Sequence, residues 1–261
     1  MRFLAETCLL THGLRSVTNE EMAAAWPFSE PCLVWVENGE IIHGDMERFL
    51  SFRANCANVI RFDCYNLAEG LEKGLSGALT ASGTMEVCRR EGVPLAVTCG
   101  MGGIGDIAGE ELCPDLPALS DLGVALIATS PKDMLNIPAT LDYLKSHGVT
   151  VAGNRCTGYV FYSTDVETSV PLSAYPNAAA IESAAKNGGL LLLNPIPENQ
   201  REQDLTIVEK AVEAGKRAEA TGGYYHPAAN AEIDRLTVGH SSRIQLNSFI
   251  ANIRMAREIP E

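Results

Sequence analysis

Short apolar runs alternate with longer amphipathic stretches from about residue 92 to the end of the chain. The runs that predict buried strands are Leu95–Thr98, Val124–Ala128, Val149–Ala152 and Leu190–Leu193. The stretches with helical spacing of apolar residues are Pro131–Ser146, Ala178–Lys186, Gln203–Ala220 and Ile244–Glu258. Buried β runs separated by helices of this length are typical of βαβ units. The pattern therefore predicts an α/β fold with three layers, α/β/α, around a mostly parallel central sheet.

The first third of the chain is less regular, but it contains one strong turn signal. Asn38-Gly39 separates the run Leu33–Glu37 from the run Glu40–His43. Asn-Gly is favoured in two-residue hairpin turns, so we expect a small hairpin that caps or edges the main sheet. No internal repeat, low-complexity tract or Pro/Ser-rich linker interrupts the sequence. Residues 1–261 are therefore predicted to form a single domain.

Composition limits the classes of function. The formal net charge of −13 argues against a nucleic-acid partner, because phosphate backbones require clustered Lys and Arg. The eight cysteines are scattered singly without a CxxC pair, which indicates reduced thiols and neither disulfides nor a zinc site. The segment Met1–His12 lacks the features of a secretion signal, and no run reaches about 18 apolar residues. We expect a cytoplasmic protein that does not cross a membrane.

The segment Gly100–Gly105 satisfies GxGxxG after a predicted strand, but it is a poor dinucleotide site. Such a site requires a helix directly after the loop, and Asp106, Gly109 and Pro114 do not favour one there. Two interpretations stay open. The loop is either a tight turn that needs glycine torsions, or a loop whose backbone approaches a ligand at the carboxyl ends of the strands.

Lys132 follows a predicted strand in a setting that suits chemistry. Ser130 is a good N-cap and Pro131 a good first helical residue, so the sequence predicts Lys132 in the first turn of a helix, before Pro138 separates that turn from a longer helix. The helix dipole disfavours a cation there, and a neutral amine is a nucleophile. The alternative is a lysine whose stem carries its ammonium into water. The local sequence alone favours this alternative.

Several segments together identify a family. They are Leu4–Gly13, Thr80–Met85, Val97–Ile104, Ala128–Lys132, Gly188–Leu190, Asn194–Glu198 and Ser242–Leu246. In these segments, and most strongly after residue 76, the chain resembles the pseudouridine-5′-phosphate glycosidase family, which is also called indigoidine synthase A-like. The run Asn-Pro-Ile-Pro-Glu, at the family's spacing from Lys132, is more specific than any glycine loop.

The resemblance implies a C-glycosidase of the lyase type, which separates uracil from ribose 5-phosphate across a carbon–carbon bond. Lys132 matches the family's nucleophile, which holds C1′ of the sugar as an imine, and Glu6 matches its proton donor. This division suits the chemistry, because a C–C bond has no leaving oxygen to protonate and needs an electron sink. Two alternatives stay open: an aldolase-like Schiff-base enzyme acting on another carbonyl compound, and a non-catalytic paralogue that binds a nucleoside.

The same resemblance assigns further roles. Glu111 stands where the family has an aspartate that binds a divalent metal, Mn²⁺ or Mg²⁺, and oxygen ligation suits both ions. The residues that match substrate-binding positions are Asn58, Thr80, Ala81, Thr98, Cys113, Asp115 and Arg243. The family is typically a homotrimer, and its substrate is a small C-nucleoside or sugar.

Departures from the family pattern are concentrated among groups that would hold a phosphate. The substituted positions are Asn58 and Leu75 for lysines, Gly105 for a histidine, Asp106 for a basic residue, Cys113 for a serine and Arg243 for an asparagine. Each lost charge-assisted bond to phosphate costs on the order of 1.5–3 kcal/mol. We expect that the catalytic pair is kept while the substrate has changed toward an unphosphorylated C-nucleoside or another sugar conjugate. The alternative is that Arg243 serves as a relocated anion clamp.

Overall fold

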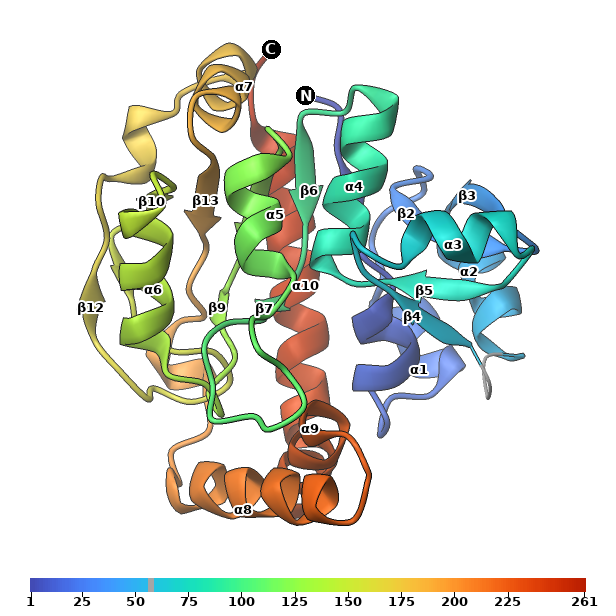
Figure 1. Cartoon of the computed structure of the whole chain (residues 1–261), viewed down its shortest axis with the longest axis vertical. Coiled ribbons are helices and arrows are strands. Elements are labelled where there is room, and N and C mark those ends of the chain that lie inside the picture. The colour runs from blue at the N-terminus through green and yellow to red at the C-terminus, as the bar shows by residue number, and fades with distance from the viewer. Residues whose placement is uncertain (56–58) are drawn as a thin grey trace.

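The computed structural model describes residues 1–55 and 59–261. The strands of its main sheet are β1 (Leu4–Ala5), β2 (Leu33–Glu37), β3 (Glu40–Gly44), β4 (Ile60–Phe62), β5 (Gly77–Leu79), β6 (Leu95–Val97), β8 (Ala125–Ala128), β10 (Thr150–Ala152) and β13 (Leu190–Leu193). Among these residues the strand order is β10-β13-β8-β6-β1-β2-β5-β4, with β3 paired to β2 (Figure 1). Two small sheets join β7 (Gly100–Met101) to β9 (Ser130–Pro131) and β11 (Arg155–Cys156) to β12 (Val166–Glu167).

Helices connect and cover these strands. They are α1 (Asn19–Ala25), α2 (Met46–Arg53), α3 (Leu67–Glu72), α4 (Ala81–Glu91), α5 (Asp115–Asp121), α6 (Ile137–Ser146), α7 (Ala178–Lys186), α8 (Thr206–Ala220), α9 (Tyr225–Leu236) and α10 (His240–Glu258). Single-turn segments lie at η1 (Leu9–Gly13), η3 (Leu172–Ala174) and η4 (Glu198–Gln200). None of the helices within the described ranges is both long and apolar enough to cross a bilayer.

The alternation of side chains along β13 shows the three layers. Leu190 and Leu192 belong to the core that contains α7 and α10, whereas Leu191 and Leu193 belong to the core that contains α4, α5 and α6. All four side chains are buried, as expected for a strand covered on both faces. The strands from β10 through β1 to β2 pair in parallel, and β2 pairs antiparallel with β3 and β5. The predicted three-layer α/β fold is confirmed.

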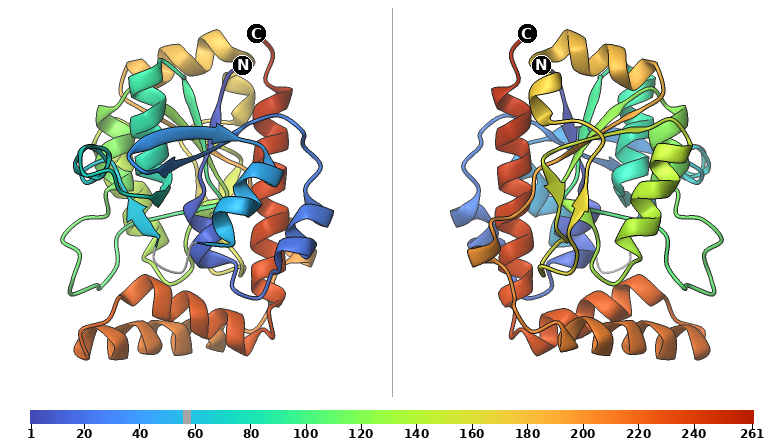
Figure 2. Two further views of the ribbon diagram at one scale, coloured as in Figure 1. Left: turned by 90° about the vertical axis from the view of Figure 1, so that its right-hand side faces the viewer. Right: turned by 90° about the vertical axis from the view of Figure 1, so that its left-hand side faces the viewer.

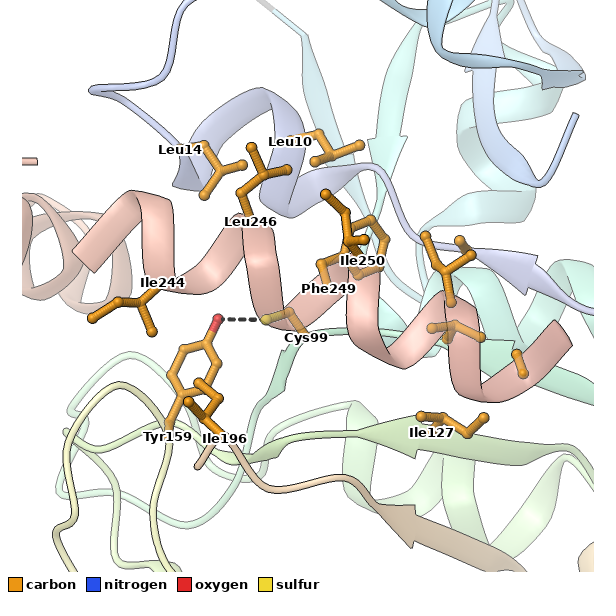
Figure 3. Close-up of a cluster of buried hydrophobic side chains, with 14 of the residues drawn as sticks. Leu10, Leu14, Cys99, Ile127, Tyr159, Ile196, Ile244, Leu246, Phe249 and Ile250 are labelled. Carbon is orange, nitrogen blue, oxygen red and sulfur yellow. Dashed lines mark hydrogen bonds between the residues drawn. The ribbon is translucent and has the colours of Figure 1, made fainter. Parts of the chain in front are cut away.

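The long helix α10 crosses one face of the sheet and ties the two ends of the molecule together. Leu246 and Ile250 point from it toward Leu10 of η1 and toward Leu14, which directly follows η1, and Ile127 of β8 lies on its other side (Figure 3). The termini meet at one end of the sheet, where the amino group of Met1 bonds the Glu261 carboxylate at 2.9 Å. The pair α8–α9 spans the opposite end (Figure 2).

Most predicted elements are confirmed within a few residues. The hairpin β2–β3 turns at Asn38 (φ 50°) and Gly39 (φ 80°), the positive torsions that favour Asn-Gly in this turn. Helix α10 begins at His240, four residues before the predicted start, and α9 was not predicted at all. The seven cysteines among the described residues are free thiols, in agreement with the expected reduced state.

The prediction that Lys132 lies in the first turn of a helix is wrong. Ser130 and Pro131 continue as strand β9, and the Lys132 amide donates to the Met101 carbonyl at 3.1 Å, across to β7. Helix α6 begins only at Ile137, because the Asn136 side chain caps it by accepting from the Ala139 amide at 3.1 Å, with Pro138 in its first turn.

Asp133 fixes the turn that follows Lys132. Its buried carboxylate accepts the backbone amides of Tyr159 at 2.8 Å, Val160 at 2.7 Å and Phe161 at 3.1 Å, and it accepts the Ser163 hydroxyl at 2.8 Å. Four donors on one carboxylate offset part of the cost of its burial, which still raises the pKa of Asp133. The residue after the candidate nucleophile is therefore held by a distant loop.

Asp133→Ala is expected to destabilise the protein by on the order of 3 kcal/mol, since it leaves three buried amides without an acceptor. Thermal and urea denaturation measure this loss. Asp142→Ala, at an exposed position of α6, is the matched control and should change stability by less than about 0.5 kcal/mol. Equal stability of the two variants would show that the turn does not depend on Asp133.

Candidate active site

The candidate catalytic residues follow neighbouring strands at one edge of the sheet. Glu6 continues β1 and its amide donates to the Val97 carbonyl at 3.0 Å, while Thr98 continues β6 and donates to the Ile127 carbonyl at 2.9 Å. Lys132 follows β9, which begins two residues after the end of β8. Because the carboxyl ends of parallel strands share one edge, ladder bonds place these three residues at the same end of the sheet. This end faces the α8–α9 pair (Figure 2).

The Glu6 carboxyl is almost fully buried, with 6% of the residue exposed. Burial raises its pKa to about 7, although the Thr98 hydroxyl, the Lys132 charge and the Cys99 amide favour the ionised form. Thr98 Oγ1 donates a short hydrogen bond to Glu6 Oε1. A carboxyl with a pKa near neutrality can both give and take a proton at physiological pH, which is the property that a general acid–base group needs.

Lys132 lies beside Glu6. Its side chain is partly buried, and its positive charge lowers the pKa of Glu6 and of Glu110. The amine and the carboxyl therefore lie close enough to interact electrostatically at the end of the sheet. The extended backbone at β9, and not a helix terminus, holds the lysine in this position.

Asp115 organises the loops around this pair. Its two carboxylate oxygens accept the amides of Ser82, at 2.9 Å, and Gly102, at 2.8 Å, so it joins the first turn of α4 to the glycine loop and to α5. A Cβ atom at Gly102 would lie 2.1 Å from the Cys113 sulfur and 3.1 Å from Asp115 Oδ2. The glycine is thus required by a close approach within the protein.

Three more predicted substrate-binding residues lie in these same loops. Thr80 caps α4 by accepting the Gly83 amide at 3.2 Å, and Ala81 is the first residue of that helix, where backbone amides have no partner within the helix. Cys113 is buried against the glycine loop, and burial raises the pKa of its thiol. The N-terminus of α4 therefore borders the group around Glu6.

Arg61 is a site residue that sequence reasoning missed. It lies on β4, and its positive charge lowers the pKa of Cys8, His12 and His226, although burial is the largest influence on each of these groups and raises the pKa of the thiol. The Glu6 charge in turn acts on Arg61. One arginine in the short strand Ile-Arg-Phe carries no pattern that a single sequence reveals.

Glu110 and His226 form a second pair that was not predicted. His226 Nε2 lies 3.1 Å from Glu110 Oε2. Burial opposes ionisation of Glu110, yet its pKa is lowered by His226, Cys113 and Lys132. Burial lowers the pKa of His226, and Glu110 partly offsets this. The pair joins the loop after β7 to the first turn of α9, two elements that are far apart in the chain.

The structure places other predicted residues differently. Arg243 pairs with Glu21 at 3.0 Å on the surface and is not among the charges that act on Glu6. Asp106, expected to repel a phosphate, is exposed and pairs with Lys216. Asn58 lies outside the described residues.

The predicted metal position has an incomplete donor set. Glu111 is exposed, and the neighbouring Glu110 faces His226. Among the described residues no three His, Cys, Asp or Glu side chains group as metal ligands. The described side chains alone therefore do not form a closed site for Mn²⁺ or Mg²⁺, and hard cations of this kind keep several waters when few carboxylates bind them. Glu111 stays a predicted metal ligand.

The fold is that of an α/β protein, and its site resembles that of an enzyme. A buried carboxyl with a pKa of about 7 lies near a lysine at the carboxyl edge of a parallel sheet. The family model for indigoidine synthase A like protein matches residues 5–261, and the chain belongs to this family.

Similar proteins were found by sequence and by structure. Three pseudouridine-5′-phosphate glycosidases, each aligned over 97–99% of this chain, are similar: 28% identity with that of Petrotoga mobilis (89% of its length), 29% with that of Mycoplasmopsis agalactiae (90%) and 28% with that of Thermus thermophilus (96%). An indigoidine synthase A-like protein from Thermotoga maritima shares the fold, with a TM-score of 0.77, 20% identity and coverage of 98% and 91% of the two chains. The prealnumycin C-glycosynthase AlnA, in complex with ribulose 5-phosphate, has a TM-score of 0.76, 22% identity and coverage of 98% and 89%.

Thr98→Val is expected to raise the pKa of Glu6 above its value of about 7, because the lost hydrogen bond stabilises the carboxylate. A bond to a charged group is worth about 1.5–3 kcal/mol, so a shift of about one to two pH units is expected. A ¹³C NMR titration of the Glu6 carboxyl measures it. Thr98→Ser, which keeps the donor, should titrate like the native protein. An unchanged midpoint in Thr98→Val would show that Thr98 does not control Glu6.

Glu6→Gln is expected to stabilise the protein above pH 7. The pKa of Glu6 rises from 4.5 to about 7 on folding, so the native state binds more protons between these values, and stability falls as pH rises through this window. Glutamine cannot ionise, so the variant should be more stable at pH 8 by up to about 3 kcal/mol and little changed at pH 4. Urea denaturation at both pH values tests this. Glu209→Gln, exposed on α8, is the control, and an equal difference at the two pH values would contradict the expectation.

Proposed function

We propose that this protein is a C-glycosidase of the lyase type, which breaks or reversibly forms the bond between a uracil-like base and ribose or ribose 5-phosphate. The single observation that carries the proposal is the Glu6 carboxyl, with its pKa of about 7, beside Lys132. The names of the similar pseudouridine-5′-phosphate glycosidases, and of the C-glycosynthase that binds ribulose 5-phosphate, support the same class of reaction.

Lys132 and Glu6 divide the chemistry between them. The neutral lysine amine attacks C1′, and the ring oxygen leaves with a proton from Glu6. The Glu6 carboxylate takes a proton from the attached nitrogen, whose lone pair then forms an imine as the C1′–base bond breaks. The base carbon keeps the bonding electrons and takes that proton from Glu6. Water hydrolyses the imine, which releases the sugar and regenerates the lysine. The Glu6 carboxyl gives or takes the proton in each of these transfers, so a pKa near 7 suits both the donation and the uptake of a proton.

The sugar end of the substrate would meet Arg61 and the first turn of α4. Arg61 provides a cation close to Glu6, although the family's lysine is replaced by Asn58 and Arg243 pairs with Glu21. Asp106 is neutralised by Lys216. One arginine binds phosphate less strongly than several cations do, so we infer that unphosphorylated pseudouridine competes better here than in a site with more cations.

An aldolase-like Schiff-base enzyme is the second candidate, since Lys132 would form an imine with other carbonyl compounds as well. A binding protein without catalysis has no need for a buried carboxyl beside a lysine, because burial of Glu6 destabilises the fold above pH 7. We also propose that the protein forms a homotrimer and binds Mn²⁺ or Mg²⁺, as the resemblance to the family implies. Sedimentation measures the number of subunits, and metal analysis of the purified protein measures the bound ion.

Borohydride reduction in the presence of pseudouridine or its 5′-phosphate is expected to trap the sugar on Lys132, because reduction converts the imine into a stable amine. Peptide mass mapping locates the adduct, and its mass identifies the sugar. Lys132→Arg should lose both the adduct and turnover, by at least about a thousandfold. Lys186→Arg, on the exposed face of α7, is the matched control and should keep both.

The outcomes separate the candidates. Turnover of pseudouridine or of its 5′-phosphate without an adduct on Lys132 would refute the imine mechanism. An adduct formed only with other carbonyl compounds would favour the aldolase-like enzyme. A strong preference for the 5′-phosphate would show that Arg61 and α4 suffice for phosphate.

A further inference from the structure

The Glu110–His226 pair has no role in the proposed reaction, yet it is largely buried and connects two separate elements of the fold. Only 23% of the Glu110 side chain and 19% of the His226 side chain are exposed, and the two meet at 3.1 Å. The residues are 116 positions apart, so two separate elements have to be held in register for them to meet.

The contacts around the pair provide this register. The loop that carries Glu110 is attached to α8 at two points, by the ion pair of Asp106 with Lys216 and by the Gly109 amide, which donates to Glu219 Oε1 at 3.0 Å. The α8–α9 pair lies across the end of the sheet at which Glu6 is found (Figure 2). Helix α9, which carries His226 in its first turn, therefore lies with α8 at this end of the sheet, and the loop of Glu110 is attached to the same pair of helices.

The second ring nitrogen of His226 has no partner. Nδ1 is buried and makes no hydrogen bond with any of the described residues. A carboxylate only accepts hydrogen bonds, so the proton lies on Nε2, toward Glu110. Burial lowers the pKa of His226, which leaves the ring neutral and Nδ1 as an acceptor. A buried acceptor without a donor is rare in native proteins and calls for an explanation.

The ring also lies within the group around the candidate nucleophile, because the charges of Lys132 and Arg61 both act on it. We propose that His226 Nδ1 accepts a hydrogen bond from a neutral donor of the bound substrate, a sugar hydroxyl or an N–H of the base, and that Glu110 fixes the ring for this contact. The pair is a specificity-determining element that selects substrates with a donor at this point. The proposal rests on the proposed function for the place of the substrate.

Two substitutions at position 226 separate the two nitrogens. In His226→Asn, the amide oxygen can take the place of Nδ1 and keep the acceptor. In His226→Gln, the amide nitrogen can take the place of Nε2 and keep the bond to Glu110, but the acceptor is lost. Steady-state kinetics with pseudouridine should show KM raised about tenfold or more in His226→Gln with kcat changed less than about threefold, and KM within about threefold of native in His226→Asn.

A binding measurement keeps this inference separate from catalysis. In Lys132→Ala, which cannot form the imine, ¹⁵N NMR of the His226 ring is followed during addition of ribose 5-phosphate, uracil or pseudouridine. The Nδ1 resonance should shift on binding, and the probe that shifts it shows whether the sugar or the base supplies the donor. A shift without turnover by the native protein would uphold the inference and refute the proposed function.

Three results would overturn the inference. One is equal loss of activity in His226→Asn and His226→Gln together with lowered thermal stability, which would make the pair purely structural. A second is binding of the three probes without change at Nδ1. The third is selective broadening of the His226 resonances by Mn²⁺ in protein first treated with chelator, which would make Nδ1 a metal ligand.

Discussion

Burial of one carboxyl at the carboxyl edge of a parallel sheet is the constraint on which this site depends. Glu6 is placed there by the ladder bond of its amide to Val97, and its position between strands keeps water away. Thr98 and Lys132 offset part of the cost of that burial, but the pKa of Glu6 still reaches about 7. The fold thus loses stability above neutral pH to keep a reactive group, a common exchange at functional sites.

The loops around this carboxyl are held by other carboxylates whose role is structural. Asp115 joins α4 to the glycine loop, and Asp133 joins the turn after Lys132 to the segment at Tyr159. Each accepts several backbone amides, which have fixed positions and cost little side-chain entropy to order. The reactive pair is therefore supported by polar contacts that leave few alternatives for the chain between the strands.

This chain differs from the family pattern more in the positions of its charged residues than in its fold. Asp106 and Arg243, which look significant in the sequence, form ion pairs with Lys216 and Glu21 near the surface. Arg61 and the Glu110–His226 pair, which carry no sequence signal, lie in the group around Lys132. Under the proposed function, recognition of a different substrate by the same reaction requires changes of this kind, because the proposed chemistry uses Lys132 and Glu6 while selectivity depends on their surroundings.

The sequence by itself determined the local features of this protein. The continuous apolar run Leu190–Leu193 predicted a buried strand, Asn38-Gly39 predicted the hairpin, and the motifs near Glu6 and Lys132 identified the family, because each signal depends on neighbouring residues. Tertiary structure decided what depends on distant residues. The turn after Lys132 is fixed by the long-range bonds of Asp133 to the amides of Tyr159 and Val160, and the contact of Glu110 with His226 joins elements more than a hundred residues apart. Contacts between residues that are far apart in the chain form only after folding, so no local pattern records them.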